Sequence, residues 1–342
     1  MTGRAAATRR KSGWRGGVWA RWDGGPRAYR QRMITLRGLT KRFGATVAVD
    51  ALTVDVAPGR VTGFLGPNGA GKSTTMRMIL GLDRPTAGQA LIGGRAYREL
   101  RRPLHEVGAL LDARAIHPAR SGRAHLLAMA HSNGIPARRV DEVLGAVGLD
   151  GRAAAKPGRT LSLGMGQRLG IAGALLGDPP VLMFDEPVNG LDPDGVRWVR
   201  QLMRSLADQG RTVFVSSHLM SEMQLTADQL VVIGRGRLLA DAPIGDVIAG
   251  SAVAVRVRSP HPDGLATLAA RLAATGATVE PVGTDELTVT GSTVDRVGDL
   301  AYELGVRLHE LSPHGASLEQ AFMELTAGSV EYAGGPTGSG AR

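Results

Sequence analysis

The sequence contains no cysteine in its 342 residues. Disulfides, thiol nucleophiles and zinc–thiolate centres are therefore excluded, and a reducing cytosol is the default compartment. It also has no run of about 18 uninterrupted apolar residues, so we expect no membrane-spanning helix. The length allows about two domains, and the apolar fraction of 43% is enough for ordinary packed cores.

Lysine is scarce, with only four in the chain, yet the formal net charge is +10. Residues 1–32 hold nine Arg and Lys against the single acid Asp23, so this segment alone carries +8. Its three tryptophans and basic charge would suit contact with nucleic acid or anionic lipid. Because it shows no regular apolar period, we favour a disordered basic tail and expect folding to begin at Met33. The remaining charge is nearly balanced, so we expect no nucleic-acid partner.

A phosphate-binding loop is the strongest signal in the sequence. Residues 66–73 fit G-x-x-x-x-G-K-[ST], after an apolar strand over 61–65 and before a helix from about Lys72. Backbone N–H groups of such a loop surround phosphate oxygens, Lys72 reaches the β- and γ-phosphates, and the Ser73 hydroxyl ligates Mg²⁺. The alternative is an ordinary glycine-rich turn. The predicted nucleotide-binding residues are Gly66, Pro67, Asn68, Gly69, Ala70, Gly71, Lys72, Ser73 and Thr74.

Two more apolar strands end in polar groups suited to catalysis. The strand over 181–184 leads into Asp185 and Glu186, of which one can support Mg²⁺ and the other can polarise an attacking water. An isolated Asp-Glu pair is more often a surface turn, but this one follows a phosphate loop. The strand over 213–215 leads to His218, at what would be the ligand-binding edge of an α/β sheet. A lone histidine is more often structural.

The remaining pattern predicts an α/β architecture in two domains. Alternating strands are expected over 34–39, 46–56 and 89–92, and helical spacing dominates a stretch from 113 to about 176. Phe43 precedes the second of these strands, where an exposed aromatic ring could stack on adenine or an ordinary one could join the core.

After residue 246 the pattern starts again. Strands are expected over 252–257, 278–282, 287–289 and 306–311, and helices over 265–274, 294–304 and 318–325. The order β-α-β-β-α-β is that of a small ferredoxin-like α+β domain, which we place at 247–328 before a flexible tail over 329–342. It shows no catalytic constellation.

From Met33 to about Asp246 the chain resembles the ATP-binding subunit of an ABC transporter. The family's landmarks occur in order: GPNGAGKST at 66–74, LSLGM at 161–165, VLMFDEP at 181–187, NGLDP at 189–193, and His218. The helical stretch over 113–176 lies where that family carries a helical insert. Among its members, the chain is most similar to stand-alone bacterial subunits of the daunorubicin-resistance and bacitracin-export type.

The resemblance implies a fold and a set of partners. The fold is a P-loop NTPase with an antiparallel β subdomain and a helical insert, and the cofactors are ATP and Mg²⁺. Two copies would form a head-to-tail dimer, with ATP between the phosphate loop of one and Ser162 and Gly164 of the other. Since residues 161–166 carry no cationic side chain, contact with phosphate there would come from a hydroxyl and backbone amides.

The resemblance also implies individual roles. Asp185 would support Mg²⁺, Glu186 would be the general base and His218 would contact the γ-phosphate. Asp192 would lie on the loop that crosses the dimer interface, and Phe43 falls where the family places its adenine-stacking aromatic ring.

Two departures from the family pattern bear on function. Leu163 and Met165 replace the first Gly and the Gln of the usual LSGGQ signature. Asp112 stands where the family has the glutamine of its glutamine loop, and Asp could still ligate Mg²⁺ but cannot donate a hydrogen bond.

We therefore expect a peripheral ATPase at the cytoplasmic face of the membrane, docked to a separate permease through the cleft beside Asp112 and residues 113–120. A second ATP-binding subunit, most simply another copy, would complete it, and export is the expected direction. The alternatives are a soluble ABC ATPase acting on ribosomes or DNA, and a nucleotide-regulated binding module that hardly hydrolyses ATP.

Overall fold

A computed structural model describes residues 33–149, 151–249, 254–314 and 317–326. The two predicted tails, 1–32 and 329–342, lie outside these ranges. No helix in the described ranges is long and apolar enough to cross a membrane.

A three-stranded antiparallel sheet in the order β2-β1-β4 opens the fold. Its strands are β1 (Ile34–Phe43), β2 (Thr46–Val56) and β4 (Ala87–Ile92). Alternation along β1 buries Ile34 and Leu36, as the sequence pattern predicts, and a register shift between Leu36 and Leu39 brings Leu39 into the core as well. The strand continues beyond its expected end at Leu39, because after a register shift it still pairs with β2 as far as Phe43 opposite Thr46.

A six-stranded sheet in the order β5-β6-β7-β3-β8-β9 forms the centre of the molecule. Its strands are β3 (Arg60–Leu65), β5 (Val107–Leu110), β6 (Val181–Asp185), β7 (Thr212–Ser216), β8 (Gln229–Gly234) and β9 (Arg237–Pro243). All are parallel except β9, which pairs antiparallel with β8. Since β6, β7 and β3 are neighbours, the segments after their carboxyl ends meet at one edge of the sheet.

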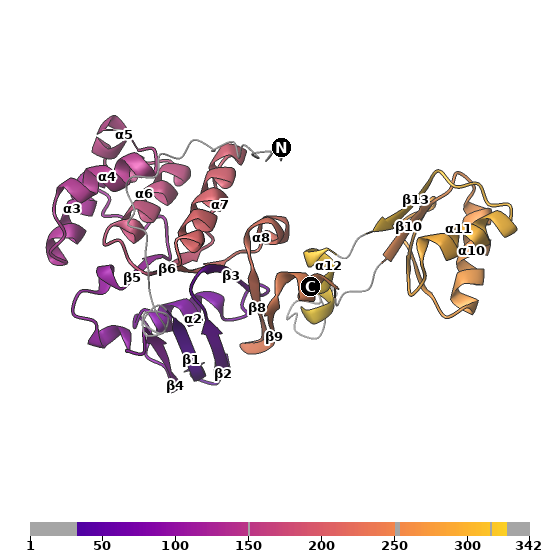
Figure 1. Ribbon diagram of the computed structural model, residues 1–342, viewed down its shortest axis with the longest axis horizontal. Helices are drawn as coiled ribbons and strands as arrows, with labels where there is room; N and C mark the ends of the chain where they lie inside the picture. Colours follow the sequence, from indigo (N-terminus) through magenta and orange to yellow (C-terminus); the bar gives the residue numbers. More distant parts are fainter. Residues whose placement is uncertain (1–32, 150, 250–253, 315–316, 327–342) are drawn as a thin grey trace, which may run out of the picture.

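Helices flank this sheet and form the predicted insert. Helix α2 (Lys72–Ile79) follows β3, α7 (Pro193–Asp208) precedes β7, and α8 (Met220–Thr226) precedes β8. The insert contains α3 (Gly122–Ser132), α4 (Arg138–Ala146), α5 (Gly151–Ala155) and α6 (Leu163–Leu175), which gather at one end of the molecule (Figure 1). Short 3-10 helices lie over Tyr97–Glu99, Pro103–His105 and Gly158–Thr160. Helix α6 also packs against β5, so the insert is attached to the sheet through α6.

Two hydrophobic cores cover the two faces of the central sheet. One joins the helical insert to side chains such as Leu182 and Val213, and the other joins the three-stranded sheet to Phe64 and Phe214. The rings of Phe64 and Phe214 lie 4.9 Å apart between centroids. The edge at which the predicted phosphate loop lies is therefore built on a sheet buried on both faces.

The C-terminal elements form a separate four-stranded antiparallel sheet in the order β11-β12-β10-β13, with a core of its own. They are β10 (Ala254–Arg258), α10 (Pro262–Ala274), β11 (Thr278–Pro281), β12 (Glu286–Thr290), α11 (Val294–Glu303) and β13 (Glu310–His314). This is the expected β-α-β-β-α-β order. The expected strand over 306–311 was placed too early: the Val306 N–H bonds the carbonyl of Ala301 in the turn that ends α11, so pairing begins only at Glu310.

Among the described residues, the apolar face of helix α12 (Leu318–Thr326) belongs to a different core from that of the four-stranded domain. The helix contacts α8 and α9 (Ile244–Ala249), and its buried residues Leu318, Ala321 and Phe322 belong to the core that joins the helical insert to the six-stranded sheet. The sequence boundary assigned this helix to the accessory domain, because helical spacing alone does not show which core an apolar face joins. The small domain is thus inserted between two helices of the first.

Candidate functional site

The phosphate loop has the backbone shape that its glycines allow. Gly69 and Gly71 have φ of 80° and 102°, in the left-handed region that other residues rarely adopt. A Cβ at Gly71 would overlap the carbonyl oxygen of Ala48. Gly71 is also the N-cap of α2, so the loop runs directly into a helix whose first N–H groups point back towards it.

Lys72 lies folded into this loop. Its Nζ donates to the carbonyl oxygens of Gly66 at 2.6 Å and Pro67 at 3.2 Å, and only 8% of the residue is exposed. Burial lowers the pKa of Lys72, and the carboxylates of Glu186 and Asp185 partly oppose this shift. The ammonium group is therefore held inside the loop by weak neutral acceptors, which phosphate oxygens can replace with stronger, charge-assisted bonds.

The end of β6 brings a carboxylate to the start of α2. The Ser73 Oγ donates to Asp185 Oδ2 at 2.8 Å, although the two residues are 112 positions apart. Ser216, fully buried at the end of β7, donates its hydroxyl to the other oxygen of Asp185. Mg²⁺ prefers hard oxygen ligands, and at phosphate sites it usually takes only one or two of them from the protein. One hydroxyl and one carboxylate meet this requirement. The Ser73–Asp185 pair therefore fits Mg²⁺.

Glu186 is held in an uncommon backbone conformation next to His218. Its φ is 50°, and its N–H bonds both the carbonyl (3.2 Å) and the hydroxyl (3.1 Å) of Ser216. The carboxylate Oε2 lies 2.8 Å from His218 Nδ1 and accepts the His218 backbone N–H at 3.3 Å. The structure therefore brings Lys72, Ser73, Asp185, Glu186 and His218 together at the β3-β7-β6 edge.

The signature motif, residues 161–165, lies at the N-terminal end of α6. Ser162 is the N-cap of α6 and accepts the Met165 N–H at 3.2 Å. Leu163 packs against Gly190, where a Cβ would overlap its side chain, and a Cβ at Gly164 would touch Leu191. Within the described residues Ser162 forms no hydrogen bond with the phosphate loop.

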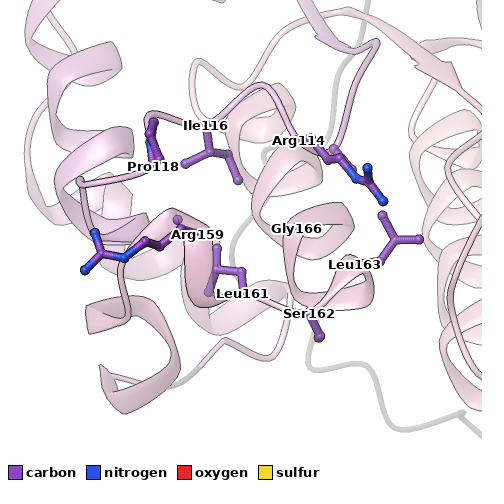
Figure 2. A pocket seen from close by; sticks show the side chains of 10 residues that line it. Arg114, Ile116, Pro118, Arg159, Leu161, Ser162, Leu163 and Gly166 are labelled. Atoms are coloured by element: carbon purple, nitrogen blue, oxygen red, sulfur yellow. The ribbon is translucent and has the colours of Figure 1, made fainter.

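A pocket of about 370 Å³ opens beside the signature residues. Figure 2 shows Arg114 pointing towards Leu163, with Ser162 at the rim and Ile116 and Arg159 on the far side. The neighbouring cleft, of about 400 Å³, lies between α2, the end of β5, α3 and α6, and Ile116 lines both spaces. The segment 113–118 is thus a thin partition between the signature motif and an open cleft.

Three other predicted residues take simpler positions. Asp192 is the N-cap of α7 and accepts the Gly195 N–H at 2.8 Å. Phe43 is 51% exposed at the tip of the β1–β2 hairpin, with Lys41 Nζ 4.8 Å from its ring centroid. Asp112 lines the cleft and accepts the Arg114 N–H at 2.8 Å, and within the described ranges no bond joins it to Ser73 or Asp185.

Sequence reasoning missed two residues that hold the site. The Ser216 hydroxyl donates to the Asp185 carboxylate and accepts the Glu186 N–H. Gln167 on α6 donates to the carbonyls of Glu186 and Asn189. The position of Ser216 at the end of an apolar strand could have signalled the first. Nothing local signals the second, because its partners come from another element.

Comparisons with known proteins agree with this geometry. Residues 49–189 match the family described as ABC transporter, and residues 253–319 match a domain of unknown function (DUF8746). The uncharacterized ABC transporter ATP-binding protein YhcH of Bacillus subtilis is 34% identical over 302 residues, covering 87% of this chain and 97% of its own length. The bacitracin transport ATP-binding protein BcrA of Bacillus licheniformis is 42% identical over 214 residues, or 62% of this chain and 70% of that protein.

A solved ATP-binding subunit of an ABC transporter superposes with a TM-score of 0.58 at 25% identity, covering 64% of this chain and 92% of that one. The ATP-binding cassette MJ0796, solved as a dimer with ADP and Pi, gives a TM-score of 0.57 at 23% identity, which shows the shared fold. The predicted P-loop NTPase fold is confirmed. With a phosphate loop, two acids and a histidine at one sheet edge and a relative matched along nearly its whole length, the chain belongs to the ATP-binding proteins of ABC transporters and is an ABC-type ATPase.

Proposed function

We propose that this chain binds ATP with Mg²⁺, dimerises around it, and drives export through a separate membrane permease at the cytoplasmic face. The observation that carries the proposal is the convergence of Lys72, Ser73, Asp185, Glu186 and His218 at one sheet edge. Transport is supported by relatives named for the transport of bacitracin and of lantibiotic, and export by a relative named for Nod factor export.

Hydrolysis is assigned to Glu186 as general base. Its carboxylate accepts the proton of the attacking water, and its bonds to His218 hold one oxygen so that the other faces the water. His218 is placed to donate to the γ-phosphate. Lys72 stabilises negative charge on the β- and γ-phosphates as it leaves the carbonyls of the loop.

Ser73 and Asp185 are the residues that would hold Mg²⁺, which neutralises charge on the phosphates when bound. Ser216 keeps the Asp185 carboxylate aimed at Ser73. Phe43, exposed at its hairpin tip, offers a face on which adenine can stack, and Lys41 beside it adds a positive charge.

The partner copy would supply the missing half of each site. Ser162 and the first N–H groups of α6, with Gly164 allowing close approach, form an N-terminal anion site whose own residues, 161–166, carry no cationic side chain. Asp192 fixes the start of α7, and so the loop 189–192 that leads to the interface. We take the dimer to be two copies of this chain.

The cleft between the sheet and the helical insert is the proposed permease site. It is lined by Leu80, Leu82, Asp112, Ile116 and Met129 among others, which together form a mixed polar and apolar surface. Asp112 bonds the backbone of residue 114 and so helps to shape this cleft, and its predicted ligation of Mg²⁺ stays a prediction. Closure of the ATP site would move residues 113–118, which separate cleft and signature.

Affinity purification of the tagged chain from membranes of its own host tests the proposal. We expect an ATPase preparation that contains a second chain with several apolar spans. Recovery of the chain with ribosomes or DNA in place of such a protein would overturn the transporter assignment and favour a soluble ABC ATPase.

A further inference from the structure

Gln167 is a buried side chain of α6 that reaches the turn carrying Glu186. Its Nε2 donates to the carbonyl oxygen of Glu186 at 3.2 Å and to that of Asn189 at 3.3 Å. Only 5% of the residue is exposed, and its Oε1 has no hydrogen-bond partner in the described part of the chain. Because both neighbours are carbonyl oxygens, the amide must present its NH₂ group to them.

The turn that Gln167 contacts is the one that sets the general base. The N–H of Asn189 bonds the carbonyl of Glu186 at 3.2 Å, and Glu186 itself has a φ of 50°. On its other side the turn is bonded to Ser216 of β7. A left-handed non-glycine residue persists only where its surroundings hold it. Here β7 holds the Glu186 N–H and α6 holds its carbonyl.

Helix α6 also carries the signature motif. Ser162 caps the helix, and Gln167 lies on its second turn, two residues before Leu169 of the core. A second contact joins the same helix to the same turn: the Leu163 side chain packs on Gly190, the residue after Asn189. A shift of Ser162 along the helix axis is therefore passed to the Glu186–Asn189 turn by one hydrogen-bonded side chain and one apolar contact.

We propose that Gln167 is a positioning residue that couples the two ATP sites of the dimer. This rests on the proposed head-to-tail dimer, in which Ser162 binds the nucleotide held by the partner's phosphate loop while Glu186 serves the nucleotide of its own chain. Engagement of Ser162 in one site then sets the general base in the other through Gln167. ATP hydrolysis becomes cooperative by this route.

The test replaces Gln167 by Met, which keeps length and apolar bulk and removes both donors. We expect kcat to fall by about 10- to 100-fold, as small displacements of a catalytic group do, with KM for ATP within about twofold. The Hill coefficient of ATP hydrolysis falls from above 1 to about 1. If the Met variant folds poorly, Gln167→Glu takes its place in the test. This variant sets an acceptor against the two carbonyls, and we expect the same loss of kcat and cooperativity.

Gln209→Met is the matched control. Gln209 is half-buried, donates to Ser205 Oγ at 3.3 Å, and also has an Oε1 without a partner in the described residues. Its variant keeps the parent kcat and Hill coefficient. Parent-like cooperativity in Gln167→Met, or an equal loss in Gln209→Met, overturns the inference. A parent chain that hydrolyses no ATP, or does so as a monomer, contradicts the proposed function instead.

Discussion

At the scale of single residues, the site depends on side chains that are distant in sequence. Glu186 and His218 are 32 positions apart and their side chains approach to 2.8 Å. Motif spacing made Lys72, Asp185 and Glu186 candidates, and the family resemblance added the role of His218. Neither predicted Ser216 or Gln167, because their part in the site is defined by which backbone groups other elements bring beside them.

The role of Lys72 gives the first prediction. In the proposed mechanism the Lys72 ammonium group exchanges its bonds to the loop carbonyls for bonds to the triphosphate. Lys72→Ala removes this cation, so we expect kcat to fall by about 10²-fold or more. Steady-state ATPase measurements on the purified chain check this. Lys156→Ala, the same change at an exposed lysine of the insert, should keep full activity. A Lys72 variant with near-parent turnover would refute the phosphate-loop assignment.

At the scale of secondary-structure elements, local pattern predicted most strands and helices and failed where tertiary contacts decide. The strand β2 has the predicted bounds, because alternation and a Pro-Gly turn mark them. β13 starts later than predicted, since the apolar residues Val306 and Leu308 pack on the domain core from a loop. Apolar spacing identified α12 as a helix and could not show that its partners are α8 and α9.

The cleft beside β5 gives a prediction at this scale. Ile116 lies in the partition between the cleft and the signature pocket, so Ile116→Glu places a charge in the proposed permease contact. We expect permease recovered with the tagged chain to drop by about tenfold in a membrane pull-down. Tyr302→Glu, at a residue of α11 that is 89% exposed, is the control and should leave recovery unchanged. Equal recovery of the permease with both variants would contradict its proposed binding at this cleft.

At the scale of the whole molecule, the chain leaves the ATP-binding part after α9 and returns to it as α12. The inserted domain has its own core, and the match to a domain of unknown function covers it. Helix α12 packs on α8, which begins two residues after His218, and the Leu318 N–H bonds Gln224 Oε1 at 3.3 Å. Both ends of the inserted domain are therefore joined to helices of the ATPase.

This connection predicts which domain each core residue supports. Phe322→Ala should lower the free energy of unfolding of the ATP-binding part by about 3 kcal/mol, because the ring belongs to that core. Thermal melts with and without Mg-ATP check this, since the transition that ATP raises is the one that should fall. Leu268→Ala, in the core of the inserted domain, should leave that transition in place. If Leu268→Ala lowered the transition that ATP raises and Phe322→Ala left it unchanged, α12 would belong to the accessory domain.

The most direct test of the account is Glu186→Gln measured with Mg-ATP. The amide keeps the shape of the carboxylate but cannot accept a proton, so ATP should bind while turnover falls by about 10²-fold or more. With hydrolysis stopped, the ATP-bound pair should accumulate, and size-exclusion chromatography with Mg-ATP should show a dimer that is absent without nucleotide. A variant that stays monomeric and hydrolyses ATP at the parent rate would contradict both the general base and the ATP-sandwich dimer.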